Sequence, residues 1–149
     1  MNSYIEMKQR HQAEVNAFPM KFAFTQESLE RGMRELGLDP KKDMEKIVAI
    51  PGGGFIRESD KQAFLDLFAR HDKERKEAVA ADKDGTGYLY HMFRYELANH
   101  EYAYTRDVSS TLDALGYTLE EIAEDPALSD AFLNAREDYL KEAEEKGWG

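Results

Sequence analysis

Patterns typical of strands occur only in the first 57 residues of this sequence, and every later segment has the pattern of a helix. Residues 21–24 alternate polar and apolar side chains, and residues 46–50 and 55–57 are two further short apolar runs. Pro51 and three glycines separate the last two runs, as expected for a turn. Because the order strand, helix, strand and strand is followed only by helices, the sequence predicts an α+β fold dominated by helices, packed on a small three-stranded sheet that is antiparallel or mixed.

Local start and stop signals place the helices. Thr25 precedes one helical pattern, Thr118 with Glu121 forms a capping box, and Asp125 before Pro126 is a typical helix start. Apolar residues at helical spacing predict five to six helices, the longer ones over residues 3–16, 59–81, 88–102 and 125–145. A chain of 149 residues can bury one core, so we expect a single domain over residues 1–149.

The composition excludes several classes of protein. There is no cysteine, which rules out disulfides, thiolate zinc sites and cysteine nucleophiles and fits a reducing compartment. The charged residues near the N-terminus do not resemble a signal peptide, and no apolar run approaches the roughly 20 residues that cross a bilayer. No Gly-x-Ser-x-Gly elbow is present. We therefore expect a cytoplasmic protein without a membrane segment or a recognisable catalytic motif.

Negative charge is concentrated at the end of the chain. Residues 107–149 contain 12 acidic and three basic residues, a net charge of −9, whereas residues 1–106 carry a net charge of −1. Such a surface repels phosphate groups, so we expect no direct binding of nucleic acid. This strongly acidic helical half has two interpretations: a solvated surface, or a surface that engages a basic partner.

Residues 82–89 nearly match the start of a calcium-binding EF-hand loop. Asp82 and Asp84 take ligand positions one and three, Thr86 position five and Gly87 the turn at position six. Position twelve requires a bidentate glutamate and is Phe93 instead. Calcium would lose two of its oxygen ligands there, so we expect a tight turn between two helices and no calcium site.

Two histidines and three acidic residues form a candidate metal site. His71 and Glu74 lie three residues apart on one expected helix, and Glu96 and His100 lie four apart on the next. If the turn at 82–87 folds these helices into an antiparallel pair, the four side chains converge, and Asp107 reaches the same place. Imidazole and carboxylate ligands suit zinc or manganese. The alternative is that the histidines form interhelical hydrogen bonds and the acids face solvent.

Several segments of the chain are distinctive as a set. They are Asn16-Ala-Phe-Pro19 and Phe22-Ala-Phe24, Gly52-Gly-Gly-Phe-Ile-Arg57, Arg70-His71-Asp-Lys-Glu74, Glu96-Leu-Ala-Asn-His-Glu-Tyr102, Tyr104-Thr-Arg-Asp107 and Thr111-Leu-Asp-Ala-Leu-Gly116. Over about residues 3–140 the chain resembles a family of small acidic proteins of unknown function encoded by phages and mobile elements of gut Firmicutes. None of these segments is a catalytic signature.

The resemblance implies a context for the acidic surface. Small cysteine-free acidic proteins of mobile elements are often inhibitors of host defence, including anti-CRISPR proteins, so we expect a non-enzymatic inhibitor of a basic host protein. The expected target is a CRISPR-Cas nuclease of the Cas9 type, contacted by Glu137, Asp138, Glu142 and Glu144 of the last helix. Two alternatives stay open: a metal-binding protein with the histidine and glutamate site, or an accessory protein of a mobile element.

Overall fold

A computed structural model describes residues 2–147, and its internal contacts divide the chain into two compact units. The helical unit consists of the residues up to Arg10 together with those from Glu74 onward. The sheet unit consists of His11–Lys73. The single domain expected over residues 1–149 stays a prediction. Trp148, expected from the sequence to be disordered or a late packing contact, lies outside the described residues.

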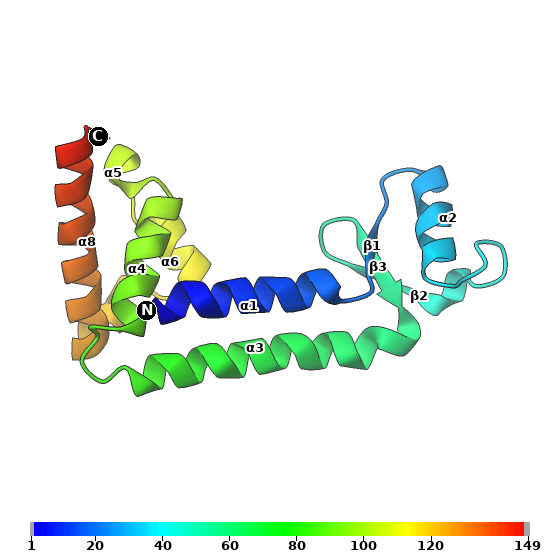
Figure 1. Ribbon diagram of the computed structural model, residues 1–149, viewed down its shortest axis with the longest axis horizontal. Helices are drawn as coiled ribbons and strands as arrows, with labels where there is room; N and C mark the ends of the chain where they lie inside the picture. Colours follow the sequence, from blue (N-terminus) through cyan, green and yellow to red (C-terminus); the bar gives the residue numbers. More distant parts are fainter. Residues whose placement is uncertain (1, 148–149) are drawn as a thin grey trace. The chain divides into compact units, whose positions relative to one another are not determined.

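Residues 2–147 form eight α-helices and one three-stranded antiparallel sheet, which confirms the predicted α+β class (Figure 1). The helices are α1 (Ser3–Ala17), α2 (Gln26–Glu35), α3 (Lys61–Ala81), α4 (Tyr88–Asn99), α5 (Tyr102–Thr105), α6 (Ser109–Leu115), α7 (Leu119–Glu124) and α8 (Pro126–Lys146). The strands are β1 (Lys21–Phe22), β2 (Ile47–Ile50) and β3 (Gly54–Arg57), in the order β1-β3-β2. None of the described helices is both long enough and apolar enough to cross a membrane.

There are more helices than the five to six expected, partly because the helix expected over residues 88–102 is interrupted. α4 ends at Asn99, and Glu101 takes a left-handed backbone conformation with φ of 55° before α5 begins. Left-handed conformations end a right-handed helix, and periodicity alone does not reveal them. The helix starts at Thr118 and Asp125 are confirmed: Thr118 forms the capping box with Glu121, and Asp125 caps α8.

The sheet unit packs α2 against one face of the sheet. Met33 of α2 and Leu36, which caps its C-terminus, are buried against Phe55 of the central strand β3. Thr25 caps α2 by accepting a hydrogen bond from the backbone N–H of Ser28 at 3.1 Å. The cap fixes where α2 begins, and the spacing of its apolar residues then directs them onto the sheet.

The turn between β2 and β3 depends on glycine. Gly53 has φ of 82°, and a Cβ atom added there would lie 2.6 Å from the ring of Phe24. Any other residue would therefore be strained in its backbone and would displace a ring. This turn allows β2 and β3 to pair antiparallel, with Val48 opposite Ile56.

Aromatic rings connect the residue after α1 with α3 within the sheet unit. Phe18 packs edge-on against Phe64 at 5.5 Å between ring centroids, and Phe64 packs on Phe68 at 4.8 Å. The sequence pattern predicts a buried stripe of Phe64, Leu67, Phe68 and His71 on α3, but Phe64 and Leu67 are only partly buried and Phe68 is 40% exposed. The stripe ends at His71, the one residue of α3 that the structure buries.

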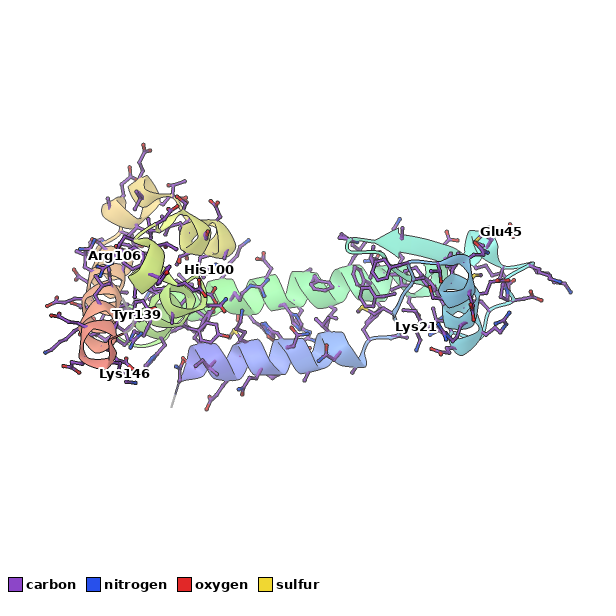
Figure 2. The ribbon with its side chains drawn as sticks, turned by 90° about the horizontal axis from the view of Figure 1, so that it is seen from above. Lys21, Glu45, His100, Arg106, Tyr139 and Lys146 are labelled. Atoms are coloured by element: carbon purple, nitrogen blue, oxygen red, sulfur yellow. The ribbon has the colours of Figure 1, made fainter. Side chains whose placement is uncertain are left out.

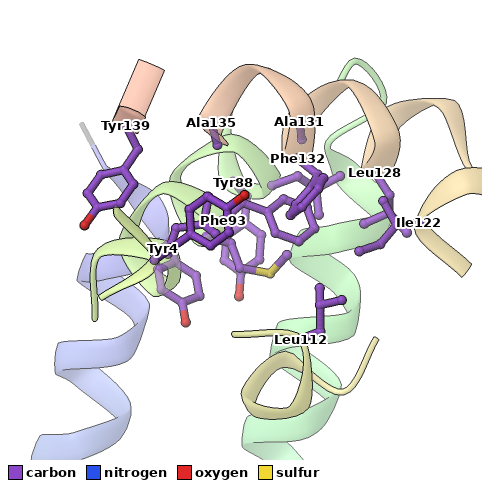
Figure 3. Close-up of a cluster of buried hydrophobic side chains, with 14 of the residues drawn as sticks. Tyr4, Tyr88, Phe93, Leu112, Ile122, Leu128, Ala131, Phe132, Ala135 and Tyr139 are labelled. Atoms are coloured by element: carbon purple, nitrogen blue, oxygen red, sulfur yellow. The ribbon is translucent and has the colours of Figure 1, made fainter. Parts of the chain in front are cut away.

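The core of the helical unit lies between α4 and α8 (Figure 3). Phe93 of α4 is fully buried and packs edge-on against Phe132 of α8, with ring centroids 5.4 Å apart. Ala131 and Ala135 of α8 are also fully buried, and their small side chains allow the two helices to approach closely. The chief neighbour of α4 is thus α8 rather than α3, the partner assumed in the candidate metal site.

The turn before α4 is organised by one carboxylate. Asp82 accepts hydrogen bonds from the backbone N–H groups of Gly85, Gly87 and Leu89, at 3.1, 3.2 and 2.9 Å. Gly85 supplies the positive φ of 73° and touches the backbone of Ala127, so no larger residue fits there. The side chain expected at the first calcium position therefore serves as a cap for the start of α4.

Replacing Asp82 with alanine should lower the free energy of unfolding by about 1–3 kcal/mol, because three backbone N–H groups lose their acceptor. Urea denaturation at neutral pH measures this difference. Asp84→Ala is the matched control, since Asp84 is exposed and should change stability by less than about 0.5 kcal/mol. Equal effects of the two substitutions would contradict the capping role.

Candidate functional site

A buried carboxylate holds α1 against α4 in the helical unit. Glu96 is only 3% exposed and accepts a hydrogen bond from the hydroxyl of Tyr4 at 2.9 Å. The ammonium of Lys8 lies 3.6 Å from the same oxygen, and Nε2 of His100 lies 3.3 Å from the other. The Thr111 hydroxyl donates to the Glu96 carbonyl at 3.3 Å. Helical spacing brings these groups together, since Tyr4 and Lys8 lie one turn apart, as do Glu96 and His100.

These contacts supply the counter-charge and the hydrogen bond that a buried carboxylate requires. Burial, followed by the charge of Glu96, raises the pKa of Tyr4 well above its ordinary value of 10.0, so this hydroxyl stays a donor. His100 Nε2 is buried and, despite its distance from Glu96, is not oriented for a hydrogen bond. In this cluster Tyr4 and Lys8 engage one carboxylate oxygen of Glu96, and the other oxygen faces His100.

A second polar cluster lies in the sheet unit. The rings of His11 and His71 are stacked with centroids 3.8 Å apart, and both residues are buried. Glu14 lies 3.0 Å from Nε2 of His71 and forms an ion pair with Arg70. The hydrogen bond from Arg70 and then that from His71 lower the pKa of Glu14 from 4.5 to about 2. The cluster joins the second half of α1 to the first half of α3.

The structure brings together one pair of the residues predicted to bind a metal. Glu96 and His100 are adjacent in the helical unit, whereas His71 contacts Glu14 in the sheet unit. Among residues 2–147 no three histidine, aspartate or glutamate side chains are placed to hold a metal ion. The geometry of the described chain gives the zinc or manganese hypothesis no support.

The other two predicted ligands have separate roles. Arg10 donates to both carboxylate oxygens of Glu74, at 3.0 and 3.3 Å. Asp107 accepts a hydrogen bond from the backbone N–H of Ser109 at 2.9 Å, and this contact lowers the pKa of Asp107. Asp107 therefore stabilises the start of α6 rather than facing Glu96 or His100 as a ligand.

Sequence reasoning missed the residues of α1 in both clusters. Tyr4, Lys8 and His11 lie at positions i, i+4 and i+7 and share one face of the helix. The sequence pattern predicts a stripe of Ile5, His11, Val15 and Phe18; His11 is buried, but Ile5 is only partly buried, whereas Tyr4 is buried. Counting tyrosine as amphipathic would have started the stripe at Tyr4.

The acidic residues expected to contact a partner are partly engaged within the protein. Glu142 forms ion pairs with Arg94 and with Lys146, the latter at 2.7 Å. Asp138 accepts a hydrogen bond from the hydroxyl of Tyr90 at 2.6 Å. These contacts reduce the charge that the C-terminal half of α8 offers to a partner. The other two predicted residues, Glu137 and Glu144, are exposed and line a groove beside α8.

Negative charge without counter-ions also lies earlier in the chain. Residues 107–135, the acidic segment, contain seven acidic residues and no lysine or arginine. Four of them are exposed, and their side chains form no ion pair or hydrogen bond among the described residues: Asp113, Glu120, Glu124 and Asp130. Leu119, next to Glu120 on α7, is 57% exposed. An unpaired acidic surface with an exposed leucine is thus the most distinctive exterior feature of the helical unit.

The fold and these clusters define a mainly helical α+β protein with two buried polar clusters and, on α7, exposed carboxylates without counter-ions among the described residues. The chain belongs to a family of unknown function, DUF7659, whose sequence model matches residues 3–138. The match covers residues of both compact units and the whole acidic segment. Neither a curated protein nor a solved structure matches the chain.

Raising the pH above 10 should destabilise the protein in part through Tyr4. The pKa of this hydroxyl is higher in the folded than in the unfolded chain, so its stabilising contribution is present below pH 10 and is lost as the pH rises further. Tyr4→Phe should therefore show a shallower loss of stability above pH 10, by up to about 1.4 kcal/mol per pH unit.

Chemical denaturation from pH 8 to pH 11, a range that includes the ordinary tyrosine pKa of 10.0, measures how the free energy of unfolding changes with pH. Tyr95→Phe is the control, because Tyr95 touches the Tyr4 ring but donates no hydrogen bond to Glu96. Identical slopes for the wild type and Tyr4→Phe would contradict the prediction.

Acid should weaken the sheet unit through Glu14. Its folded pKa of about 2 lies below the ordinary 4.5, so its contribution is present above pH 4.5 and is lost as the pH falls towards 2. Glu14→Gln should lower stability at pH 7 and lose less on acidification than the wild type. Thermal melts at pH 7 and pH 3 test this, with Glu27→Gln, which removes an exposed carboxylate, as the control.

Proposed function

We propose that the protein is a non-catalytic binding protein that engages a basic partner protein through the acidic segment. The observation that carries this proposal is the pair Glu120 and Glu124 on α7: both are exposed, and neither has a counter-ion among the described residues. They lie four residues apart on one helix face, where like charges repel.

The cost of this arrangement supports a role in binding. α7 has six residues and buries Ile122, while its exposed positions carry three glutamates. Repulsion between Glu120 and Glu124 opposes the helix by roughly 0.2–0.5 kcal/mol. A cationic partner would remove that repulsion and gain attraction, which increases the association rate. Leu119 beside them offers an apolar contact of the kind that supplies affinity at the centre of an interface.

The partner that we propose is a CRISPR-Cas nuclease of the Cas9 type in a bacterial host, which the protein would inhibit. Such nucleases hold nucleic acid in a positively charged channel. A protein with unpaired carboxylates can bind in this positively charged channel and exclude the phosphate backbone of the nucleic acid. This choice of partner follows from the resemblance to proteins of phages and mobile elements, and the acidic segment supplies the physical means.

Cleavage of target DNA by a guide-loaded nuclease of the Cas9 type tests the proposal. The protein is titrated in before or after the DNA, and we expect dose-dependent inhibition when it is added first. Glu120→Lys with Glu124→Lys should raise the half-inhibitory concentration about tenfold or more, because electrostatic attraction becomes repulsion. The same variant should lose the salt dependence of inhibition.

The matched control is Glu45→Lys with Glu58→Lys, which makes the same change in net charge at exposed positions of the sheet unit (Glu45 is labelled in Figure 2). This control should inhibit like the wild type. Undiminished cleavage at large molar excess, with several such nucleases, would overturn the nuclease proposal. Equal loss in both variants would overturn the role of α7.

A further inference from the structure

A groove of about 690 Å³ lies beside α5 and the C-terminal half of α8. Its lining includes Arg106, which follows α5, and four residues of one side of α8: Leu133, Arg136, Leu140 and Lys141. These α8 residues are spaced for one helix face, and Leu133 is 47% exposed. Figure 1 shows α5 beside this end of α8, and Figure 2 labels Arg106 there.

The backbone around α5 is strained in a way that presents Arg106. Glu101 and Arg106, at the two ends of this four-residue helix, have φ of 55° and 57°, conformations that residues other than glycine seldom adopt. Nε of Arg106 donates to the carbonyl of Ala103 at 3.1 Å, which fixes the guanidinium while leaving its terminal nitrogens for another acceptor. Strain of this kind collects at functional positions.

The groove holds cations without ion pairs. Arg106, Arg136 and Lys141 have no carboxylate partner among the described residues, although Glu137 and Glu144 also line the groove. The lining therefore carries a net charge of +1, in contrast to −9 over residues 107–149. The groove therefore suits a binding partner that presents an apolar side chain to the leucines and carboxylates to the cations.

We propose that this groove binds α7 of a second copy of the chain. α7 presents the complementary set: Leu119 is exposed, and Glu120 and Glu124 lack counter-ions. Leu119 would pack on Leu133 and Leu140, and the two glutamates would pair with Arg136, Lys141 or Arg106. Because Leu119 is exposed within its own chain, the contact joins two molecules, and reciprocal exchange closes a dimer.

Charge exchange between copies tests the proposal. The groove variant carries Arg136→Glu and Lys141→Glu, and the acidic-helix variant carries Glu120→Arg and Glu124→Arg. Sedimentation velocity of the full chain up to about 1 mM covers weak association. We expect the wild type to self-associate and each variant alone to stay monomeric. An equimolar mixture should associate again, because in that pair each groove meets an α7 of opposite charge.

Lys41→Glu with Lys42→Glu, exposed residues of the sheet unit, is the control for net charge and should associate like the wild type. Circular dichroism confirms that each variant is folded. A monomeric wild type throughout this range, or a mixture that stays monomeric, would overturn the proposal. The dimer contact occupies the glutamates proposed to meet a nuclease, so the two contacts compete. The groove variant retains the acidic segment without the dimer contact, and its binding to a nuclease tests the proposed function separately.

Discussion

The packing of α4 on α8 determines the position of the buried Glu96 and of the groove beside α8. Ala131 and Ala135 bring the two helices close enough for Phe93 and Phe132 to fill the space between them. This contact fixes the direction in which the polar side chains of α4 point. Glu96 is turned inward, where it needs Tyr4 and Lys8 as partners, and α8 is left with an outer side that borders the groove.

The same packing explains why net charge is a poor guide to binding in this chain. α8 carries many of the acidic residues, yet Arg94 and Tyr90 of α4 engage Glu142 and Asp138. α7 has no basic residue in its own sequence, and its exposed glutamates stay unpaired. Exposed charge without a counter-ion is the quantity relevant to a partner, and it depends on which helices meet.

Two helix starts were predicted correctly from signals within a few residues of each other, whereas contacts between distant segments were not predicted. Thr118 with Glu121 and Asp125 with Pro126 mark helix starts that the structure confirms, because capping is a local interaction. The pairing of α4 with α8 joins residues about 40 positions apart and leaves no local pattern. The metal hypothesis failed to gain support for the same reason: it required α4 to lie against α3. Glu96 and His100 were found as a pair because they share one helix face.

The turn at Asp82 has a consequence for how motifs of this kind are recognised. In a calcium loop, carboxylates point inward to surround a cation, whereas here backbone N–H groups surround a carboxylate, which is an inverted electrostatic arrangement. The segment is in effect an anion-binding nest whose anion is covalently attached. We therefore expect its conformation not to depend on calcium concentration. Asp82→Ala would remove the carboxylate and leave the backbone N–H groups in place. Free formate or acetate in the buffer could then bind these N–H groups and restore the turn.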